Sequence, residues 1–140
     1  MKRQQGFTLI ELIVVIVILG ILAATALPKF VGVSTEARIA VLKGLQGSVQ
    51  SAATMAYGTA LAKGVDVNAA TATMTVTGVG SVNLVYGYPA KTSIDTLLQD
   101  KAGTTYTTDT WALQTGCTLQ YVEPTASGAS PTYTLTSSGC

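Results

Sequence analysis

A long uncharged segment near the N-terminus constrains this chain more than any other feature. No charged side chain occurs from Leu12 to Leu27, and the apolar character begins at Phe7. Counted from Phe7, the segment has about 21 residues, or roughly 31 Å as a helix, which is enough to cross the hydrocarbon core of a bilayer. We therefore expect residues 7–28 to form a transmembrane helix.

A single carboxylate, Glu11, lies four residues into this segment. A charged group at the centre of a membrane helix costs roughly 2.5–3.5 kcal/mol on insertion scales. Nothing in the same helix neutralises Glu11 unless the chain is cut before Phe7, because a cut there creates an α-amino group one helical turn away. A plain N-terminal membrane anchor is the alternative, and it leaves Gly6 and Glu11 unexplained.

The residues around Gly6 form a motif, which reads Lys2-Arg3-Gln4-Gln5-Gly6 and then Phe7-Thr8-Leu9-Ile10-Glu11 before the apolar segment. This motif resembles the class III leader of type IV prepilins. The resemblance implies that prepilin peptidase cuts between Gly6 and Phe7 and that Phe7 is then N-methylated. It also implies that Glu11 sets the register of a new subunit in a growing helical filament.

Residues 1–6 are therefore expected to be a cleaved leader peptide and not part of the fold. Lys2 and Arg3 precede the apolar segment, and this charge bias predicts a cytoplasmic N-terminus and a periplasmic C-terminal domain. The resemblance implies a precursor in the inner membrane. It further implies a homo-oligomeric extracellular pilus, built by an assembly platform and exported through a secretin.

Two residues interrupt the helical character of the apolar segment, namely Gly20 and Pro28. Proline removes one backbone hydrogen bond and clashes with the preceding turn, which predicts a kink near residues 24–28. The resemblance implies that residues 20–28 lose helicity when subunits pack into a filament. Simple tolerance of glycine and proline in a membrane helix is the alternative.

After Pro28 the pattern becomes amphipathic. Apolar residues recur every three or four positions, at Phe30, Val33, Ala37, Val41, Leu45, Val49, Ala52 and Met55. This spacing predicts a helix face that packs on a globular domain. Lys63 followed by Gly64 is typical of a helix end, so we expect one helix from about Phe7 to about Ala62. Glu36, Arg38 and Lys43 are assigned to a solvated face, with a charge pair to a neighbouring subunit as the alternative.

The rest of the chain predicts short strands separated by turns. Residues 71–77 and 81–86 predict a hairpin, and Pro89 ends its second strand because proline cannot donate a ladder hydrogen bond. We expect a short helix after Thr92, a polar loop at 103–109, and further strands at 111–113, 117–122 and 132–136. The predicted fold is α+β, a type IV pilin fold with the long helix packed on a roughly four-stranded antiparallel sheet.

Two cysteines, Cys117 and Cys140, lie late in the chain. Disulfides persist outside the cytosol, so an exported chain favours their pairing, with two free thiols as the alternative. The bond would close a loop of about 24 residues and contribute roughly 3–3.5 kcal/mol in the chain-entropy model. Residues 117–140 resemble the disulfide-bounded region of type IV pilins, inside a globular domain of residues 29–140.

The composition argues against several function classes. The chain has no histidine, which removes the commonest general base and metal ligand, and no nucleophile motif or paired carboxylates replace it. Asp66 and Asn68 do not make a calcium-binding pattern. We predict no catalytic site, metal or cofactor. Loss of Lys2 and Arg3 leaves six basic and seven acidic side chains. The sequence shows no stripe of basic residues of the kind that binds nucleic acid, so nucleic-acid binding is not favoured.

The resemblance extends to a subfamily through residues 82–89, the segment around Trp111, residues 117–121 and residues 138–140. These stretches resemble major pilins of the mannose-sensitive haemagglutinin type. That resemblance implies a pilus that attaches to a host or abiotic surface and serves biofilm formation or motility. A pseudopilin of a type II secretion system and a minor pilin are the alternatives. The cysteine pair and the scarcity of acidic residues after Asp109 favour a pilin.

Overall fold

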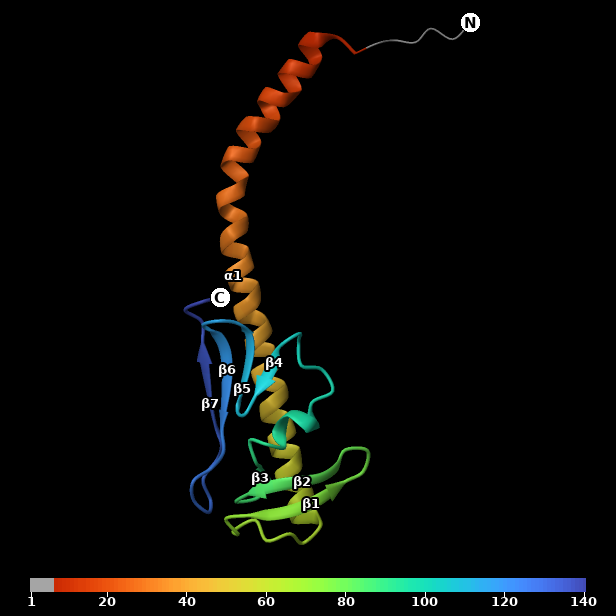
Figure 1. Ribbon diagram of the computed structural model, residues 1–140, viewed down its shortest axis with the longest axis vertical. Coiled ribbons are helices and arrows are strands. Elements are labelled where there is room, and N and C mark those ends of the chain that lie inside the picture. The colour runs from red at the N-terminus through yellow and green to blue at the C-terminus, as the bar shows by residue number, and fades with distance from the viewer. Residues whose placement is uncertain (1–6) are drawn as a thin grey trace, which may run out of the picture. The chain divides into compact units, whose positions relative to one another are not determined.

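The computed structural model describes residues 7–140, and between residues 27 and 32 it describes the backbone only. One helix, α1 (Leu9–Ala62), accounts for the first part of the chain (Figure 1). The chain divides into two compact units, Met1–Glu36 and Ala37–Cys140, and α1 contributes residues to both. The prediction of a single helix ending near Ala62 is confirmed.

In the first unit, α1 includes an 18-residue stretch, Leu9–Ala26, that is long and apolar enough to cross a membrane. The helical backbone continues through Gly20 and Pro28. Thr25 is a polar residue within this stretch, and its hydroxyl donates to the Leu22 carbonyl at 3.0 Å. Such back-bonding satisfies the hydroxyl inside the helix, so Thr25 does not interrupt the apolar surface.

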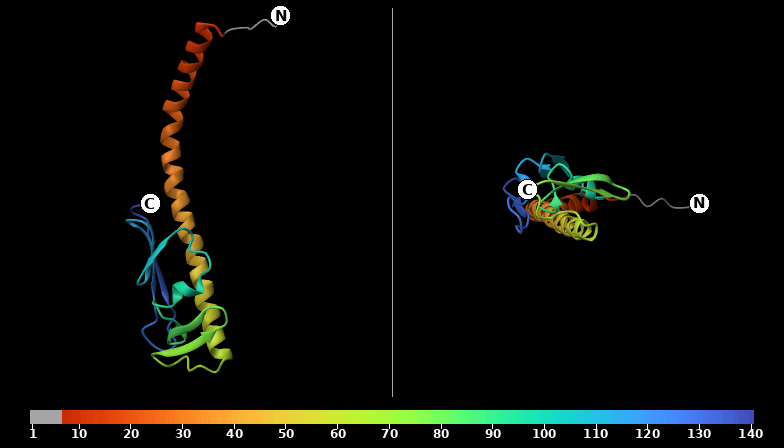
Figure 2. Two further views of the ribbon diagram at one scale, coloured as in Figure 1. Left: turned by 45° about the vertical axis from the view of Figure 1, so that its right-hand side comes forward. Right: turned by 90° about the horizontal axis from the view of Figure 1, so that it is seen from below.

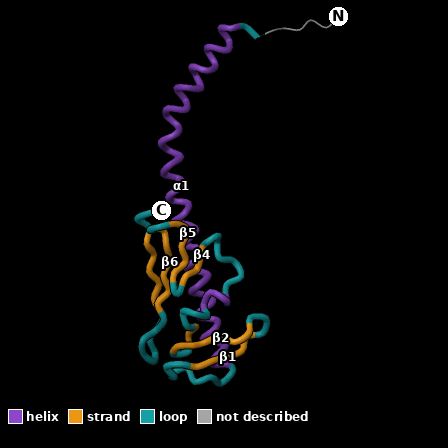
Figure 3. Tube along the Cα trace, in the orientation of Figure 1, coloured by secondary structure: helices purple, strands orange, loops and turns teal. Residues whose placement is uncertain are grey.

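The second unit contains all of the strands in the described part of the chain (Figure 3). A three-stranded sheet is formed by β1 (Ala72–Val76), β2 (Gly80–Val85) and β3 (Tyr88–Pro89). A four-stranded sheet is formed by β4 (Thr105–Thr107), β5 (Thr110–Gln114), β6 (Cys117–Val122) and β7 (Thr132–Thr136). Neighbouring strands are antiparallel in both sheets, and a short 3₁₀ helix, η1 (Ile94–Leu97), connects them.

The α+β prediction is confirmed, but the strands form two sheets where one of about four strands was expected. The three-stranded sheet gains β3 because the chain reverses at Tyr86 and Gly87, both with positive φ. Glycine is required at position 87, where a Cβ atom would lie 2.7 Å from the Val67 Cβ. Pro89 therefore lies inside a two-residue strand rather than just beyond β2.

The segment 103–109, expected to be a loop, contains the short strand β4. Its threonine-rich sequence lacks the apolar alternation that identifies a strand. Tertiary packing decides the outcome instead, because the Tyr106 ring lies 4.6 Å from the Trp111 ring, centroid to centroid. Tyr106 and Trp111 are also register partners between β4 and β5.

Both sheets lie on one side of the second half of α1 (Figure 2). The larger core cluster joins Leu42, Leu45 and Val49 of α1 to Trp111 and Tyr121 of the four-stranded sheet. All five side chains are at most 3% exposed. Burying a large apolar side chain contributes roughly 1.5–3 kcal/mol, so this cluster is the main source of stability in the unit.

A second core cluster lies under the three-stranded sheet, where Ala56 and Ala60 of α1 contact Met74, Val82 and Leu84. Alanine has no side chain beyond Cβ, so the helix approaches this sheet closely. Hydrogen bonds supplement the packing between the sheets. The Tyr121 hydroxyl donates to the Pro89 carbonyl at 2.7 Å, which joins β6 to the last residue of β3.

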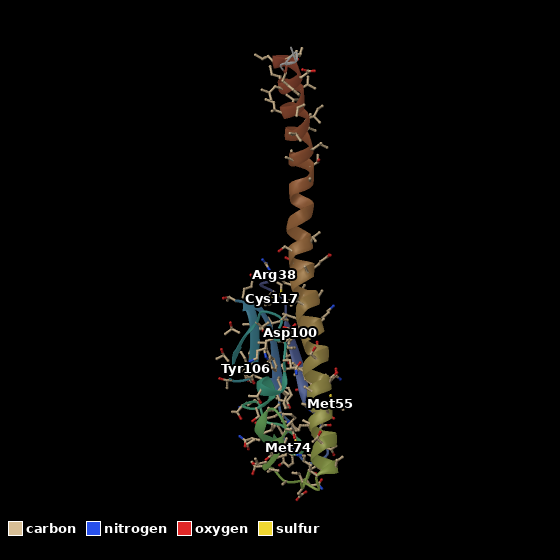
Figure 4. The ribbon with its side chains drawn as sticks, turned by 90° about the vertical axis from the view of Figure 1, so that its right-hand side faces the viewer. Arg38, Met55, Met74, Asp100, Tyr106 and Cys117 are labelled. Carbon is tan, nitrogen blue, oxygen red and sulfur yellow. A yellow bond between two sulfur atoms is a disulfide. The ribbon has the colours of Figure 1, made fainter. Side chains whose placement is uncertain are left out.

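The buried face of α1 differs in part from the predicted stripe. Leu45 and Val49 are buried as expected, but Val41 is 40% exposed and Met55 is 72% exposed. The apolar surface of the helix is wider than the sheets can cover, and the domain buries Leu42 and alanines instead. Phe30 lies among the residues whose side chains are not described. Met55 lines an open groove of about 410 Å³ together with Met74 of β1 (Figure 4).

Two aspartates organise the polar edge of the four-stranded sheet. Asp95 accepts a hydrogen bond from the Trp111 indole at 3.0 Å and pairs with Lys101. Asp109 accepts hydrogen bonds from the Gln120 amide at 3.0 Å and from the Thr110 hydroxyl at 2.8 Å. The Gln120 amide, and secondly the Thr110 hydroxyl, hold the pKa of Asp109 below its ordinary value of 3.8.

The C-terminus is bonded both to α1 and to the four-stranded sheet. Cys117 of β6 and Cys140 form a disulfide. The Arg38 guanidinium of α1 donates to the Cys140 carbonyl at 2.8 Å, and Arg38 and Cys117 are labelled in Figure 4. Gly139 makes this closure sterically feasible, because a Cβ atom there would lie 2.1 Å from the Thr115 carbonyl oxygen.

The Asp109 contacts predict a pH-dependent contribution to stability. A lowered folded-state pKa means that this stability is present above about pH 4 and is lost as the pH falls through the ordinary pKa toward the folded one. The measurement is the Tm of the mature chain in micelles, followed by circular dichroism at about pH 6 and at about pH 3. The decrease in Tm between these two pH values should be smaller for Asp109→Asn than for the unmodified chain. Asp100→Asn, at an exposed aspartate, is the matched control. An equal decrease in all three proteins would contradict the expectation.

The close contact at Gly139 predicts that Gly139→Ala destabilises the domain. The added methyl group forces the Cys140 end away from the Thr115 carbonyl, and overpacking of this kind costs roughly 1–3 kcal/mol. Denaturant unfolding under non-reducing conditions measures the change. Ser137→Ala, at an exposed position two residues earlier, is the control, and equal stability of the two variants would show that the contact is not restrictive.

Candidate assembly site at the N-terminus of the helix

The first unit presents apolar side chains that nothing in the described residues covers. Every large apolar side chain from residue 7 to residue 22 is at least 45% exposed, and none of the 18 residues in Leu9–Ala26 is buried. Water is an unfavourable environment for a surface of this size and continuity. This half of α1 therefore requires lipid or another protein chain around it.

Glu11 takes part in a reciprocal hydrogen-bonded cap with Thr8. The Thr8 backbone N–H donates to Glu11 Oε2 at 2.9 Å, and the Thr8 hydroxyl donates to the same oxygen at 2.7 Å. In return, the Glu11 backbone N–H donates to Thr8 Oγ1 at 3.4 Å. Thr8 immediately precedes the first helical residue, Leu9, so this is a capping box that satisfies two unpaired donors of the helix end.

The sequence interpretation considered Glu11 but missed the role of Thr8. The signal was available, since threonine followed three residues later by glutamate is typical of a helix start. Thr8 supplies hydrogen bonds and no positive charge. The Glu11 carboxylate therefore remains an anion without a cation partner among the residues that the structure describes.

A shallow hollow of about 320 Å³ adjoins the carboxylate, lined by Phe7, Ile10, Glu11, Val14 and Val15. Both donors from Thr8 reach Oε2, so Oε1 accepts no hydrogen bond from the described residues. The hollow beside Glu11 is lined by apolar atoms. This arrangement suits an incoming cation or strong donor that is itself carried by an apolar chain.

The other predicted site residues are located as follows. Gly6 lies outside the described residues, whereas Phe7 is 79% exposed beside Glu11. Gly20 lies further along the helix, where an added Cβ atom would meet nothing within 4 Å. Packing within this chain therefore does not require glycine at that position. The backbone at Pro28 is helical, and its side chain is not described.

Residues 7–140 contain no group of three histidine, cysteine or acidic side chains that could hold a metal ion. The two cysteines are joined in the disulfide. The hydrogen bonds of Asp95 and Asp109 connect strands and loops of the domain itself.

Comparison with known proteins finds a matching family model and several relatives that match over part of their length. The family model described as the prokaryotic N-terminal methylation motif matches residues 1–27. The type IV narrow pilus major component PilA5 of Thermus thermophilus is 48% identical over 63 residues, covering 45% of this chain and 53% of the relative. The type II secretion system core protein G of Pseudomonas aeruginosa is 51% identical over 43 residues, covering 31% of this chain and 30% of the relative.

A fimbrial protein of Pseudomonas aeruginosa is 63% identical over 30 residues, which is 21% of this chain and 20% of the relative. The chain thus spans about half the length of the first of these relatives and less of the others. No solved structure matches. The methylation motif and these local similarities support a relationship to the type IV pilins and to the core protein G of type II secretion.

Proposed function

We propose that this chain is a type IV prepilin, whose mature form is a structural subunit of a pilus filament. The observation that carries the proposal is the uncovered apolar stretch Leu9–Ala26 of α1, with one capped carboxylate at its start and the methylation motif across it. Similarity to a pilus major component supports the same proposal. The N-terminal apolar helix fits a membrane-anchored precursor that is later assembled outside the cell.

Maturation begins with prepilin peptidase cutting between Gly6 and Phe7. Lys2 and Arg3 keep the leader in the cytoplasm, so the cut occurs on the cytoplasmic side of the inner membrane. The new α-amino group of Phe7 is then N-methylated. The 79% exposure of Phe7 is consistent with access by both enzymes.

Glu11 then has two successive partners. In the membrane, the two Thr8 donors solvate one carboxylate oxygen and lower the cost of carrying an acid in an apolar helix. In the filament, the free Oε1 meets the Phe7 amine of a neighbouring subunit. A subunit out of register leaves both charges unpaired in an apolar core, which is strongly unfavourable.

The apolar helices of many copies replace lipid contacts by helix–helix contacts in the filament core. Residues 20–28 lose helicity there, and Gly20 and Pro28 are the residues least suited to keeping it. Residues 29–140 form the globular domain, with the region 117–140 held by its disulfide. We assign the subunit to the major pilins of the mannose-sensitive haemagglutinin type, which implies attachment to a host or abiotic surface.

The partners proposed for this chain are further copies of itself, prepilin peptidase, and the assembly platform and secretin of the pilus system. A pseudopilin of a type II secretion system is the second candidate. Similarity to core protein G over 43 residues favours it. The two candidates predict the same maturation and differ in whether long surface fibres are formed.

Intact-mass analysis of fibres sheared from the cell surface tests the proposal. The expected mass is that of residues 7–140 plus one methyl group, lower by two hydrogens without reduction because of the disulfide. A mature chain found only in the inner membrane would favour the pseudopilin. Retention of residues 1–6 in a functional cell would overturn the prepilin assignment itself.

Replacement of Glu11 by valine should allow maturation but impair assembly. The variant lacks the carboxylate that selects the register. An unpaired charge in an apolar core costs roughly 2.5–3.5 kcal/mol, whereas a tenfold change in population needs only about 1.4 kcal/mol. We expect at least about tenfold fewer sheared fibres in cells without a wild-type copy. Glu36→Gln, at an exposed glutamate of the same helix, is the control. Normal fibre yield in Glu11→Val would refute the register mechanism.

A further inference from the structure

Strand β7 forms one free edge of the four-stranded sheet. The strand order is β4-β5-β6-β7, so β6 is the only strand that pairs with β7 among the described residues (Figure 1). The exposed Thr132, Thr134 and Thr136 alternate along β7 with the half-buried Tyr133 and Leu135. An edge strand presents backbone N–H and C=O groups with which a further strand can pair. The edge of β7 is therefore a candidate interaction surface.

The hydrogen bonds of β6 show which backbone groups of β7 are already paired. The Tyr121 N–H of β6 donates to the carbonyl of Asp109, the residue just before β5, at 2.8 Å. Successive residues of a strand direct their backbone groups to opposite sides, so the neighbouring Gln120 directs its groups to β7. Its register partner there is Thr134, whose backbone groups are therefore used by β6.

Tyr133 and Leu135, one on each side of Thr134, consequently direct their backbone groups away from β6. Each contributes one N–H and one C=O to the free edge. Within residues 7–140, none of these four groups bonds to a turn, a loop or another strand. The free edge of β7 thus carries two donors and two acceptors, placed symmetrically about Thr134.

The other sheet edges in the described part of the chain are protected. On β1, the Lys63 ammonium donates to the Thr75 carbonyl, and β3 and β4 have only two and three residues. Lysine side chains and very short edge strands are two ways in which proteins prevent pairing between sheet edges. Strand β7 has neither, because it has five residues and no charged side chain occurs from residue 124 to residue 140.

We propose that the free edge of β7 pairs with β7 of a second copy of this chain, antiparallel and with a two-fold axis at Thr134. In this register Tyr133 of each copy lies opposite Leu135 of the other. The four outward groups of each strand then find partners in four hydrogen bonds between the copies, and the contact is isologous. The two strands bring no like charges together, because β7 has none.

Neighbouring registers satisfy fewer of the outward groups. A shift of two residues in one direction places Leu135 opposite Pro131, which has no N–H to donate. The opposite shift places Tyr133 opposite Ser137, whose carbonyl already accepts the Cys140 N–H at 3.2 Å. The register centred on Thr134 is therefore the one that the backbone groups favour.

The pairing leaves room for both helices. Trp111 of β5 and Tyr121 of β6 belong to the core cluster that contacts α1, so α1 lies beneath these two strands. In the paired sheet, β6 of one copy lies three strand spacings, or roughly 14 Å, from β6 of the other. Two helices of about 10–12 Å diameter fit beneath such a sheet.

The small size of the contact predicts weak pairing between single chains. Two strands of five residues bury less surface than a stable dimer needs, so we expect a dissociation constant on the order of 1 mM. The pairing itself does not rest on the proposed function. In the proposed filament, neighbours are related by a helical operation, so a two-fold contact would join copies in different fibres. Many such contacts along two fibres would add by multivalency.

Cysteine cross-linking of the mature chain in micelles tests the proposal. Thr134 lies opposite its own counterpart at a non-hydrogen-bonded position, where Cα atoms are about 4.5 Å apart, within the range of a disulfide. Under mild oxidation, Thr134→Cys should therefore give covalent dimers on non-reducing gels. Peptide mapping confirms that the new bond joins the two introduced cysteines and that the Cys117–Cys140 disulfide is intact.

Thr132→Cys is the matched control, since it lies on the same strand and is equally classed as exposed. In the proposed register it lies opposite Thr136 of the second copy and roughly 14 Å from its own counterpart. It should give at least about tenfold fewer dimers than Thr134→Cys, but should cross-link when mixed with Thr136→Cys. Association of the apolar helices within one micelle would affect all three variants alike.

A charge at the two-fold axis provides the second test. Thr134→Lys, added to both the Thr132→Cys and Thr136→Cys chains, places two lysines opposite each other and should reduce their mixed dimer about tenfold. Thr125→Lys, in the exposed loop before β7, should leave it unchanged. Near-ultraviolet circular dichroism checks that each variant is folded, and the comparison of Thr134→Cys with Thr132→Cys decides the outcome if Thr134→Lys unfolds.

Two results would overturn the proposal. Equal cross-linking of Thr134→Cys and Thr132→Cys would indicate parallel or unspecific contact, and no cross-linking of either would show that the edges do not pair. Neither result bears on whether surface fibres form. A chain that pairs through β7 but never forms fibres would instead refute the proposed function and leave the β7 contact intact.

Discussion

The contact between the middle of α1 and the four-stranded sheet is the interaction on which the rest of the globular unit depends. Leu42, Leu45 and Val49 bury their side chains against Trp111 and Tyr121. The disulfide and the hydrogen bonds of Asp95 and Asp109 join strands, loops and the C-terminus to one another, but not to α1. They could not hold the sheet on the helix without this apolar contact. The apolar side chains also set the orientation of β6, from which Tyr121 reaches the Pro89 carbonyl of β3.

The same helix meets two different environments along its length. From Leu42 onward one face is covered by the chain's own sheets, while Leu9–Ala26 has no covering residues in the described structure. Hydrophobic burial has no direction, so an uncovered apolar helix is satisfied equally by lipid and by copies of itself. This equivalence gives a physical basis for moving a subunit from a membrane into a filament. The Thr8–Glu11 cap adds a hydrogen-bonded carboxylate at the start of this apolar stretch.

The closure at the C-terminus shows how little of the surface chemistry follows from local sequence. Arg38, Cys117, Gly139 and Cys140 meet at one place although they come from three parts of the chain. Gly139 allows the backbone segments to approach there, because a Cβ atom at that position would lie 2.1 Å from the Thr115 carbonyl oxygen.

By itself, the sequence determined the long helix, its apolar first half, the leader motif, the α+β class and most strand positions, because each depends on local periodicity, charge or turn residues. Tertiary structure alone decided the division into two sheets, the short strand β4, the burial of Leu42 and Ala53 in place of Val41 and Met55, and the partner of Arg38. The physical reason is that α1 carries more apolar surface than the domain can cover. Only the packed sheets select which part of that surface is buried.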